Sequence, residues 1–257
     1  MSSTGEQQAC KNCGNSFSEN FCNQCGQRAA HRITLPHVLH DMVHVFLHAD
    51  KGVFPFIVRL IIQPGVLARE YVDGKRKIFN PYQFLIICVS FVLFLLAQSH
   101  FYEMLEAENA AKANRFPTYF QKAMADFNWA VKRYANVITF LHLPVIALFA
   151  WLFFKKRQHN YAEHFTIIVF AVSLAYTMNA LAILGYLVFN IQSLSTASIS
   201  VLLLVISLIV TYKQFYRLPL WTAVWKSILM YGASYVVQVL IMGTGLLVHI
   251  LLLKGKH

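Results

Sequence analysis

The amino-acid sequence predicts an all-α integral membrane protein with about five transmembrane helices. Only 13% of its 257 residues are charged and 57% are hydrophobic, whereas soluble domains carry about 25% charged residues. Its mean hydropathy is +0.50. The first of several uncharged apolar runs, residues 82–98, has about the length that a helix needs to cross a bilayer. We expect no cleavable signal peptide, because residues 1–32 are polar and rich in cysteine.

Residues 1–30 predict a small cytosolic zinc ribbon. Four of the five cysteines follow the spacing C-x2-C-x8-C-x2-C, and a glycine comes directly after each pair. Four thiolates suit a closed, tetrahedral, structural Zn²⁺ site, and metal binding would supply the folding energy of so short a segment. An iron–sulfur site or a redox dithiol pair is the alternative. The predicted ligands of the single zinc ion are Cys10, Cys13, Cys22 and Cys25.

Residues 31–80 predict amphipathic, interfacial helices beside the membrane. A helix over residues 34–51 would place four histidines on one face and apolar side chains on the others. We interpret the histidine face as the polar side of a helix that lies on the inner leaflet. The alternative is a second metal site, because histidines at positions i and i+4 can chelate one ion. The four residues are His37, His40, His44 and His48.

The rest of this region leads into the first span. Residues 53–62 are apolar but too short to cross a bilayer, and Arg59 interrupts them, so we expect an interfacial or re-entrant segment. The sequence Gln63-Pro64-Gly65 predicts a turn. A basic cluster then precedes the first span and should stay on the cytoplasmic side, which fixes the direction of insertion. This cluster consists of Lys75, Arg76 and Lys77.

The order of these motifs resembles that of a bacterial family of unknown function. The sequence contains CxxCG…FCxxCGQ, then QPGVLAREYVDGKRKIFNPYQFL, then several apolar helices. Members of that family carry an N-terminal zinc ribbon, a PG…REY..GKR…P motif and a polytopic membrane region. The resemblance covers residues 10–85, and REYVDGKRK is its most specific part. It implies a membrane location and brings no activity with it.

Residues 81–257 predict a polytopic helical membrane domain. After a polar connection over residues 101–134, we expect further spans at about 135–154, 165–189, 199–212 and 227–253, with the fourth beginning near residue 194. The third apolar run is long enough that a helical hairpin is an alternative to a single span. Most of the 22 Lys and Arg residues fall in segments assigned to the cytoplasm, which predicts a bacterial cytoplasmic (inner) membrane protein with its N-terminus inside and its C-terminus outside. The second span is closed by Lys155, Lys156 and Arg157.

The sequence favours a binding protein over an enzyme. It contains no nucleophile elbow, zinc-protease motif or phosphate-binding loop, and the five predicted spans hold no charged residue, which argues against an ion-coupled transporter. We hypothesise a membrane anchor whose ribbon is a separable docking or regulatory head for a cytosolic protein. The alternatives are a small transporter or channel subunit and a lipid-modifying enzyme.

Other partners follow from the charge pattern. Because the cations mostly flank apolar runs, the lipid bilayer and its anionic headgroups are favoured over nucleic acid. A homo-oligomer is compatible with the sequence. Four polar residues within the predicted spans are interpreted as hydrogen-bonding groups between helices. They are His142, Asn179, Gln238 and His249. The alternative is a cavity lined by three of them, His142, Asn179 and Gln238.

Overall fold

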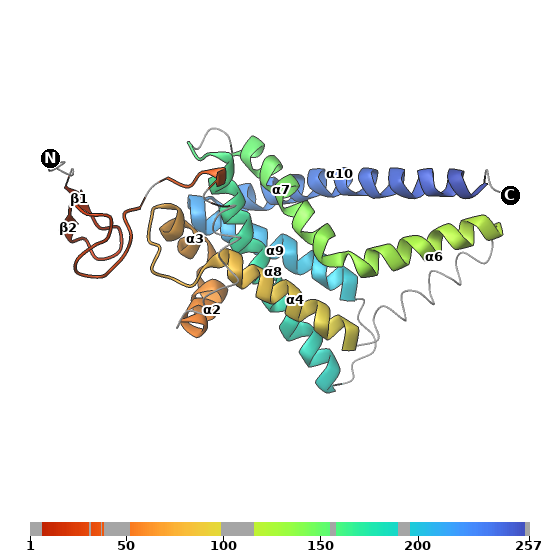
Figure 1. The fold of residues 1–257 in the computed structure, drawn as a ribbon, viewed down its shortest axis with the longest axis horizontal. Coiled ribbons are helices and arrows are strands. Elements are labelled where there is room, and N and C mark those ends of the chain that lie inside the picture. Colours follow the sequence, from red (N-terminus) through yellow and green to blue (C-terminus); the bar gives the residue numbers. More distant parts are fainter. Residues whose placement is uncertain are drawn as a thin grey trace.

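The computed structural model describes residues 7–30, 32–36, 38, 52–98, 116–154, 158–189 and 196–254. A small cysteine-rich ribbon lies at one side of the molecule, and a bundle of helices makes up the rest (Figure 1). The predicted histidine face at His37, His40, His44 and His48 lies outside the described residues, as do Lys155, Lys156 and Arg157.

The ribbon is built from two very short strands and two cysteine-containing turns. Strand β1 (Gln8–Ala9) pairs antiparallel with strand β2 (Ser16–Phe17), and Phe21 forms an isolated bridge with Arg28. The small core of the ribbon consists of Cys10, Phe17 and Cys22. So little apolar surface cannot stabilise a fold without a further cross-link.

In the part of the chain that the structure describes, five helices are long and apolar enough to cross a membrane, as the sequence predicts. They are α4 (Pro81–Gln98), α7 (Ala135–Phe153), α8 (Tyr161–Phe189), α9 (Thr196–Tyr216) and α10 (Leu220–Lys254). The third predicted span is one continuous helix and not a hairpin, because nothing in its sequence breaks the backbone hydrogen bonding. Helix α6 (Thr118–Arg133) precedes α7 and packs against α10.

The helices extend beyond the uncharged windows that hydropathy marks out. Helix α8 begins four residues before the predicted Phe165, and α10 begins seven residues before Ser227. The predicted spans themselves contain no charged residue, but the helices that include them do, because Glu163, Lys213 and Lys226 lie within α8, α9 and α10 just outside those windows. Hydropathy ends a span at the first charge, whereas a helix continues for as long as its backbone bonds are satisfied.

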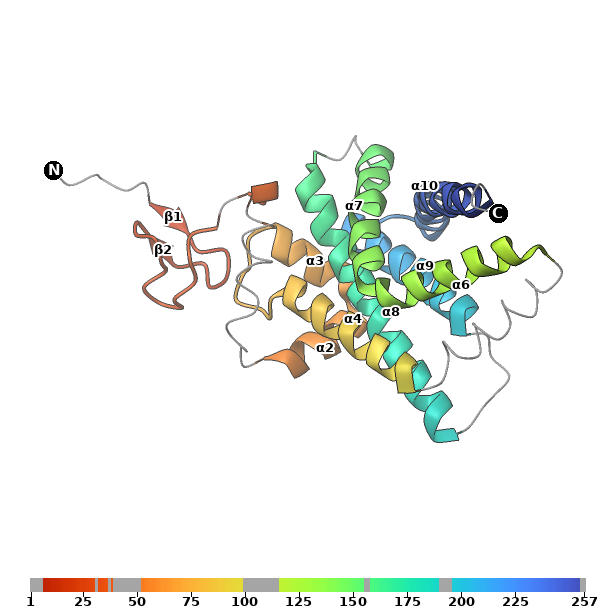
Figure 2. The same cartoon turned by 45° about the vertical axis from the view of Figure 1, so that its right-hand side comes forward.

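Helix α8 is the centre of the bundle. Helices α4, α7, α9 and α3 all pack on it (Figure 2), and residues 167–172 are buried on every side. At one end of the bundle, the starts of α4, α8 and α10 lie beside the ends of α7 and α9. Tyr82 near the start of α4 bonds Thr166 of α8, Phe154 after α7 stacks on Tyr216 of α9, and Lys226 of α10 donates to the Phe153 carbonyl. We call this the ribbon end of the bundle.

Between Gly52 and the first span the described chain forms two short helices, and both pack onto the bundle. Helix α2 (Val53–Ile62) buries Phe56 and Leu60 in the main core, and its opposite face is exposed and apolar at Phe54, Val58 and Ile62. Helix α3 (Pro64–Val72) begins directly after α2, so the predicted turn at residues 63–65 is in fact a one-residue junction between two helices. Proline at the first helical position lacks only an N–H that has no intrahelical partner there.

Helix α3 lies against the last turn of α9 at the distance that only glycine allows. A Cβ atom added to Gly65 would lie 2.2 Å from the Thr211 carbonyl oxygen and 2.6 Å from the Phe215 nitrogen. One turn later, the Arg69 guanidinium donates to the Phe215 carbonyl at 2.7 Å and also to the Gln214 carbonyl. These are carbonyls at a helix C-terminus, which have no partner within the helix. Helix α3 therefore both touches and caps α9.

We expect Gly65→Ala to destabilise the protein. The added methyl group meets backbone atoms of α9, which cannot rotate away as a side chain could, so the two helices must separate. The expected loss is about 1–3 kcal/mol, seen as a lower melting temperature in detergent. The matched control is Gly243→Ala, because nothing lies within 4 Å of a Cβ there. An unchanged melting temperature for Gly65→Ala would contradict the described contact.

Candidate metal centre and the polar layer beside it

The four predicted cysteine ligands lie together in the ribbon. Their sulfur atoms are all within 4.8 Å of one another, and the Sγ–Sγ distances are 3.6 Å for Cys10–Cys25 and 3.6 Å for Cys13–Cys22. Tetrahedral Zn–S bonds of about 2.3 Å would separate neighbouring sulfur atoms by about 3.8 Å. The four cysteines can therefore hold a metal ion with little movement of the chain.

Each cysteine pair sits in a tight turn that glycine completes. Gly14 and Gly26 have φ angles of 79° and 71°, a region that L side chains rarely adopt. The N–H of Gly14 donates to the Cys10 carbonyl at 2.9 Å, and that of Gly26 donates to the Cys22 carbonyl at 2.8 Å. These turns bring the two cysteines of each pair to the same point.

The second turn favours the thiolate form of Cys22 and Cys25, whose pKa values are lowered. At Cys13 the Asn15 backbone N–H lowers the pKa, but burial and the other three cysteines outweigh it and raise the pKa. Burial alone raises the pKa of Cys22, but the backbone N–H groups of Cys25 and Gln24 donate to its sulfur and lower the pKa to about 6. A thiolate is the form in which cysteine ligates a cation. Four such ligands would close the coordination sphere and leave no position for a substrate. The chemistry of the donor set is that of a structural metal site.

The ribbon is attached to the loop between α3 and α4 by one buried glutamine. Gln27, which directly follows the second knuckle glycine, donates from Nε2 to the Gly74 carbonyl at 2.9 Å and accepts from the Arg76 N–H at 3.1 Å. Gly74 has a φ of 106°, and a Cβ there would lie 2.8 Å from the Ala30 Cβ. The ribbon thus contacts residues 74–77, which we call the GKRK loop, as closely as a core element would. The sequence does not predict this contact.

Of the three predicted orienting cations, Lys77 contacts the ribbon, and the side chains of Lys75 and Arg76 contact α3. Lys77 donates to the Cys25 carbonyl, the Arg76 guanidinium lies 4.1 Å from the centre of the Tyr71 ring, and Lys75 pairs with Glu70 at 3.1 Å. Their role in setting the direction of insertion stays a prediction.

An ion-pair network joins α2, α3 and the loop. Glu70 pairs with Arg59 at 2.7 Å as well as with Lys75. Burial alone raises the pKa of Glu70, but the hydrogen bonds and charges of Arg59 and Lys75 outweigh it and lower that pKa below its usual value. Arg59, which interrupts the apolar run of α2, therefore has a specific partner one helix further along the chain.

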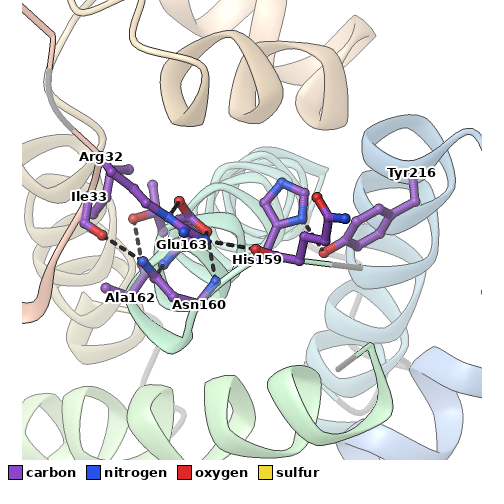
Figure 3. Close-up of polar contacts among 9 residues, drawn as sticks. Arg32, Ile33, His159, Asn160, Ala162, Glu163 and Tyr216 are labelled. Carbon is purple, nitrogen blue, oxygen red and sulfur yellow. Dashed lines mark hydrogen bonds and ion pairs between the residues drawn. The ribbon is translucent and has the colours of Figure 1, made fainter. Parts of the chain in front are cut away.

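A second set of polar contacts lies at the start of α8 (Figure 3). The Asn160 side chain accepts from the Glu163 N–H at 2.8 Å, and the Glu163 carboxylate accepts from the Asn160 N–H at 2.7 Å. This reciprocal pair is a capping box. Glu163 is nearly fully buried and also accepts two bonds from Arg32, at 2.8 and 3.1 Å, which raise the Arg32 pKa. Asn160 donates to the Ile33 carbonyl as well, so the segment after the ribbon is fastened to α8.

A cluster of two histidines and two tyrosines adjoins the capping box. The Tyr216 hydroxyl lies 3.3 Å from His159 Nδ1 and 3.3 Å from His164 Nε2. The other ring nitrogen of His164 lies 3.3 Å from the Tyr212 hydroxyl. His164 and Tyr212 are fully buried, whereas His159 and Tyr216 are partly exposed. Phe154 stacks on both tyrosine rings, at 4.7 and 5.1 Å.

The four polar residues predicted within the spans lie apart and have separate neighbours. Asn179 accepts from Ser200 of α9 at 2.8 Å, and His249 pairs with Asp126 of α6 at 2.9 Å, so these two do join helices. Gln238 contacts Met242 of its own helix. The His142 ring lies 6.2 Å from that of Tyr231.

The capping box at the start of α8 can be predicted from the sequence. Asn160-x-x-Glu163 directly before an apolar run is a capping-box signature, and it marks the true start of α8. The Arg32–Glu163 and Gln27–Gly74 contacts join positions far apart in the chain, so no local sequence pattern predicts them.

One known family matches part of the chain. Residues 50–94 match a family described as "Protein of unknown function (DUF3667)". No curated protein and no solved structure matches the chain. The matched segment contains α2, α3, the GKRK loop and the first part of α4. Its motif residues Gly65, Arg69, Glu70 and Gly74 make the contacts described above, so in this structure the motif holds α3 and the ribbon in place.

We expect Gln27→Ala to release the GKRK loop without loss of metal. The substitution removes both bonds to the loop and touches none of the four sulfur ligands, so amide hydrogen exchange should rise at residues 74–77 while the knuckles stay protected. Stripping the metal with a chelator should raise exchange in both places. Gln24→Ala is the matched control, because Gln24 is exposed. Equal exchange at residues 74–77 in the two variants would refute the attachment.

Proposed function

We propose that this protein anchors a zinc ribbon at the cytoplasmic membrane and presents it to a cytosolic protein. The observation that carries the proposal is the two-sided exposure of the ribbon. Its Gln27 edge is buried against the GKRK loop, whereas Phe21 and Arg28 are exposed. A ribbon that served only to cover the bundle would not need an exposed aromatic side chain.

Zinc is the metal that the ligand set favours. Four cysteine sulfurs in two glycine-completed turns match the chemistry of structural Zn²⁺, and such a site stabilises a fold too small to have an adequate core. In this proposal zinc does not react. It holds the backbone in the conformation that places Gln27 on one side and Phe21 on the other.

The docking surface consists of Phe21 and Arg28. The two residues face each other in an antiparallel bridge, and directly opposed residues project their side chains to the same face. Gln27 is next to Arg28, and successive side chains of an extended chain alternate in direction, which explains why Gln27 is buried and Arg28 is not. Aromatic and arginine side chains dominate the energetics of protein interfaces. The partner surface should therefore offer an apolar pocket beside an acidic group.

Loss of the exposed aromatic group should abolish partner binding and leave the membrane protein intact. We expect Phe21→Asn to reduce recovery of one cytosolic protein at least tenfold in copurification from mild detergent. Wild type and variant should both carry about one zinc per chain by elemental analysis. A Cys22→Ser/Cys25→Ser variant should lose both the zinc and the partner and still accumulate in the membrane.

The control for this experiment is Glu19→Gln, since Glu19 is exposed on the ribbon but lies outside the bridge. It should keep both zinc and partner. Undiminished partner recovery by Phe21→Asn would refute the docking surface, and wild-type protein without zinc would refute the metal.

The proposal places the ribbon end in the cytoplasm. The basic loop of Lys75, Arg76 and Lys77 lies at this end, and cations close to a span are retained on the cytoplasmic side. The alternation of the five long helices then carries the C-terminal end of α10 to the other face. Reporter fusions at the N-terminus should be active in the cytoplasm, and fusions after Lys254 should be active outside. Reporters that place both termini on one side of the membrane would refute this topology.

A further inference from the structure

The side chains of His159, His164 and Tyr216 meet at one point at the ribbon end of the bundle. Two imidazole nitrogens, Nδ1 of His159 and Nε2 of His164, each lie 3.3 Å from the same phenol oxygen. The three groups come from different places: His159 precedes α8, His164 lies in its first turn, and Tyr216 is the last residue of α9. The junction of α8 and α9 thus brings together three atoms that can each ligate a metal.

The two separations between the Tyr216 oxygen and the histidine nitrogens suit a metal ion. Bonds of about 2.0–2.1 Å from a tetrahedral ion to nitrogen or oxygen place neighbouring ligand atoms about 3.3–3.4 Å apart. Both separations are 3.3 Å. The sulfur atoms of the ribbon show the same relation, since they lie 3.6 Å apart in pairs, close to the separation in a four-thiolate site.

The surroundings of His164 match those of a metal-binding histidine. A ligating imidazole usually bonds through its second nitrogen to a fixed partner, which sets the tautomer and the direction of the ring. Here Nδ1 of His164 lies 3.3 Å from the buried Tyr212 hydroxyl, so Nε2 is the nitrogen turned to Tyr216. The Phe154 ring, stacked on both tyrosines, holds the two hydroxyls in place.

The position of the cluster gives an ion access. It lies where α9 ends, at the ribbon end of the bundle. His159 and Tyr216 are partly exposed while His164 is buried, so an ion can enter from the ribbon end and a fourth position stays accessible to water or another ligand. Imidazole nitrogen and phenolate oxygen are borderline-to-hard donors that suit first-row divalent ions.

We propose that His159, His164 and Tyr216 form a second metal site, open at one position, for a first-row divalent cation such as Zn²⁺ or Co²⁺. It is separate from the ribbon and has a different ligand chemistry, with nitrogen and oxygen in place of sulfur. Tyr212 is a positioning residue that orients His164.

Cobalt titration of the full-length, detergent-purified protein tests the site. We expect about one additional Co²⁺ per chain with the visible absorption of a tetrahedral N/O site, without the strong sulfur-to-metal charge-transfer bands that cobalt in the ribbon would give. Tyr216→Phe removes the oxygen ligand and keeps the stacked ring, and it should weaken Co²⁺ binding at least tenfold. His159→Gln should do the same from a partly exposed position that the core does not depend on.

His249→Gln is the matched control, because His249 pairs with Asp126 on α6, far from the ribbon end, and it should bind Co²⁺ as the wild type does. Two results would overturn the proposal in favour of a hydrogen-bonded cluster only. One is the absence of N/O cobalt absorption in the wild type. The other is equal Co²⁺ affinity in wild type, Tyr216→Phe and His159→Gln, each with a wild-type elution profile.

Discussion

The close contact of Gly65 with the last turn of α9 is the constraint on which the ribbon end of the molecule depends. It lets α3 lie against the α9 backbone, and Arg69 then reaches the terminal carbonyls of that helix. With α3 held in this way, Tyr71 packs in the core against Phe170 of α8, and Glu70 is placed to bind Arg59 and Lys75. A single position without a side chain thus determines where the following loop leaves the bundle.

The loop in turn determines where the ribbon lies. Gly74 turns the chain so that its own carbonyl and the Arg76 N–H face the same way, and one glutamine side chain satisfies both. Because Gln27 directly follows the second knuckle, its position depends on the metal-binding turn. The order of dependence runs from α9 to α3, then to the loop and the ribbon. This explains physically why the CGQ and GKR elements occur in one chain: they form the two halves of one contact.

The sequence predicts those parts of the structure that depend on local chemistry. Hydropathy finds the five long helices because each is apolar along its own sequence, whether it is largely exposed, as α10 is, or buried among the other helices, as α8 is. The cysteine spacing finds the ribbon because each pair of cysteines lies in a local turn. The Pro64-Gly65 pair was misread as a turn, since the same two residues serve a helix start and a close helix contact. The His159–His164–Tyr216 cluster could not be predicted, because it exists only once α8 and α9 pack together.

The polar groups of this molecule gather where a bilayer allows them. Within the hydrocarbon core an unpaired polar group costs several kcal/mol. At a helix end, water and lipid headgroups are close enough to form hydrogen bonds with it. Among the described residues, Glu163 and His164 lie in the first turn of α8, Lys213 lies in the last turn of α9, and Lys226 lies in the second turn of α10, all at the ribbon end. A metal at the cluster of His159, His164 and Tyr216 would contact α8 and α9. Glu163 attaches the segment after the ribbon to α8, and Arg69 attaches α3 to α9. The proposed docking surface and the proposed metal site would then be supported by the same two helices.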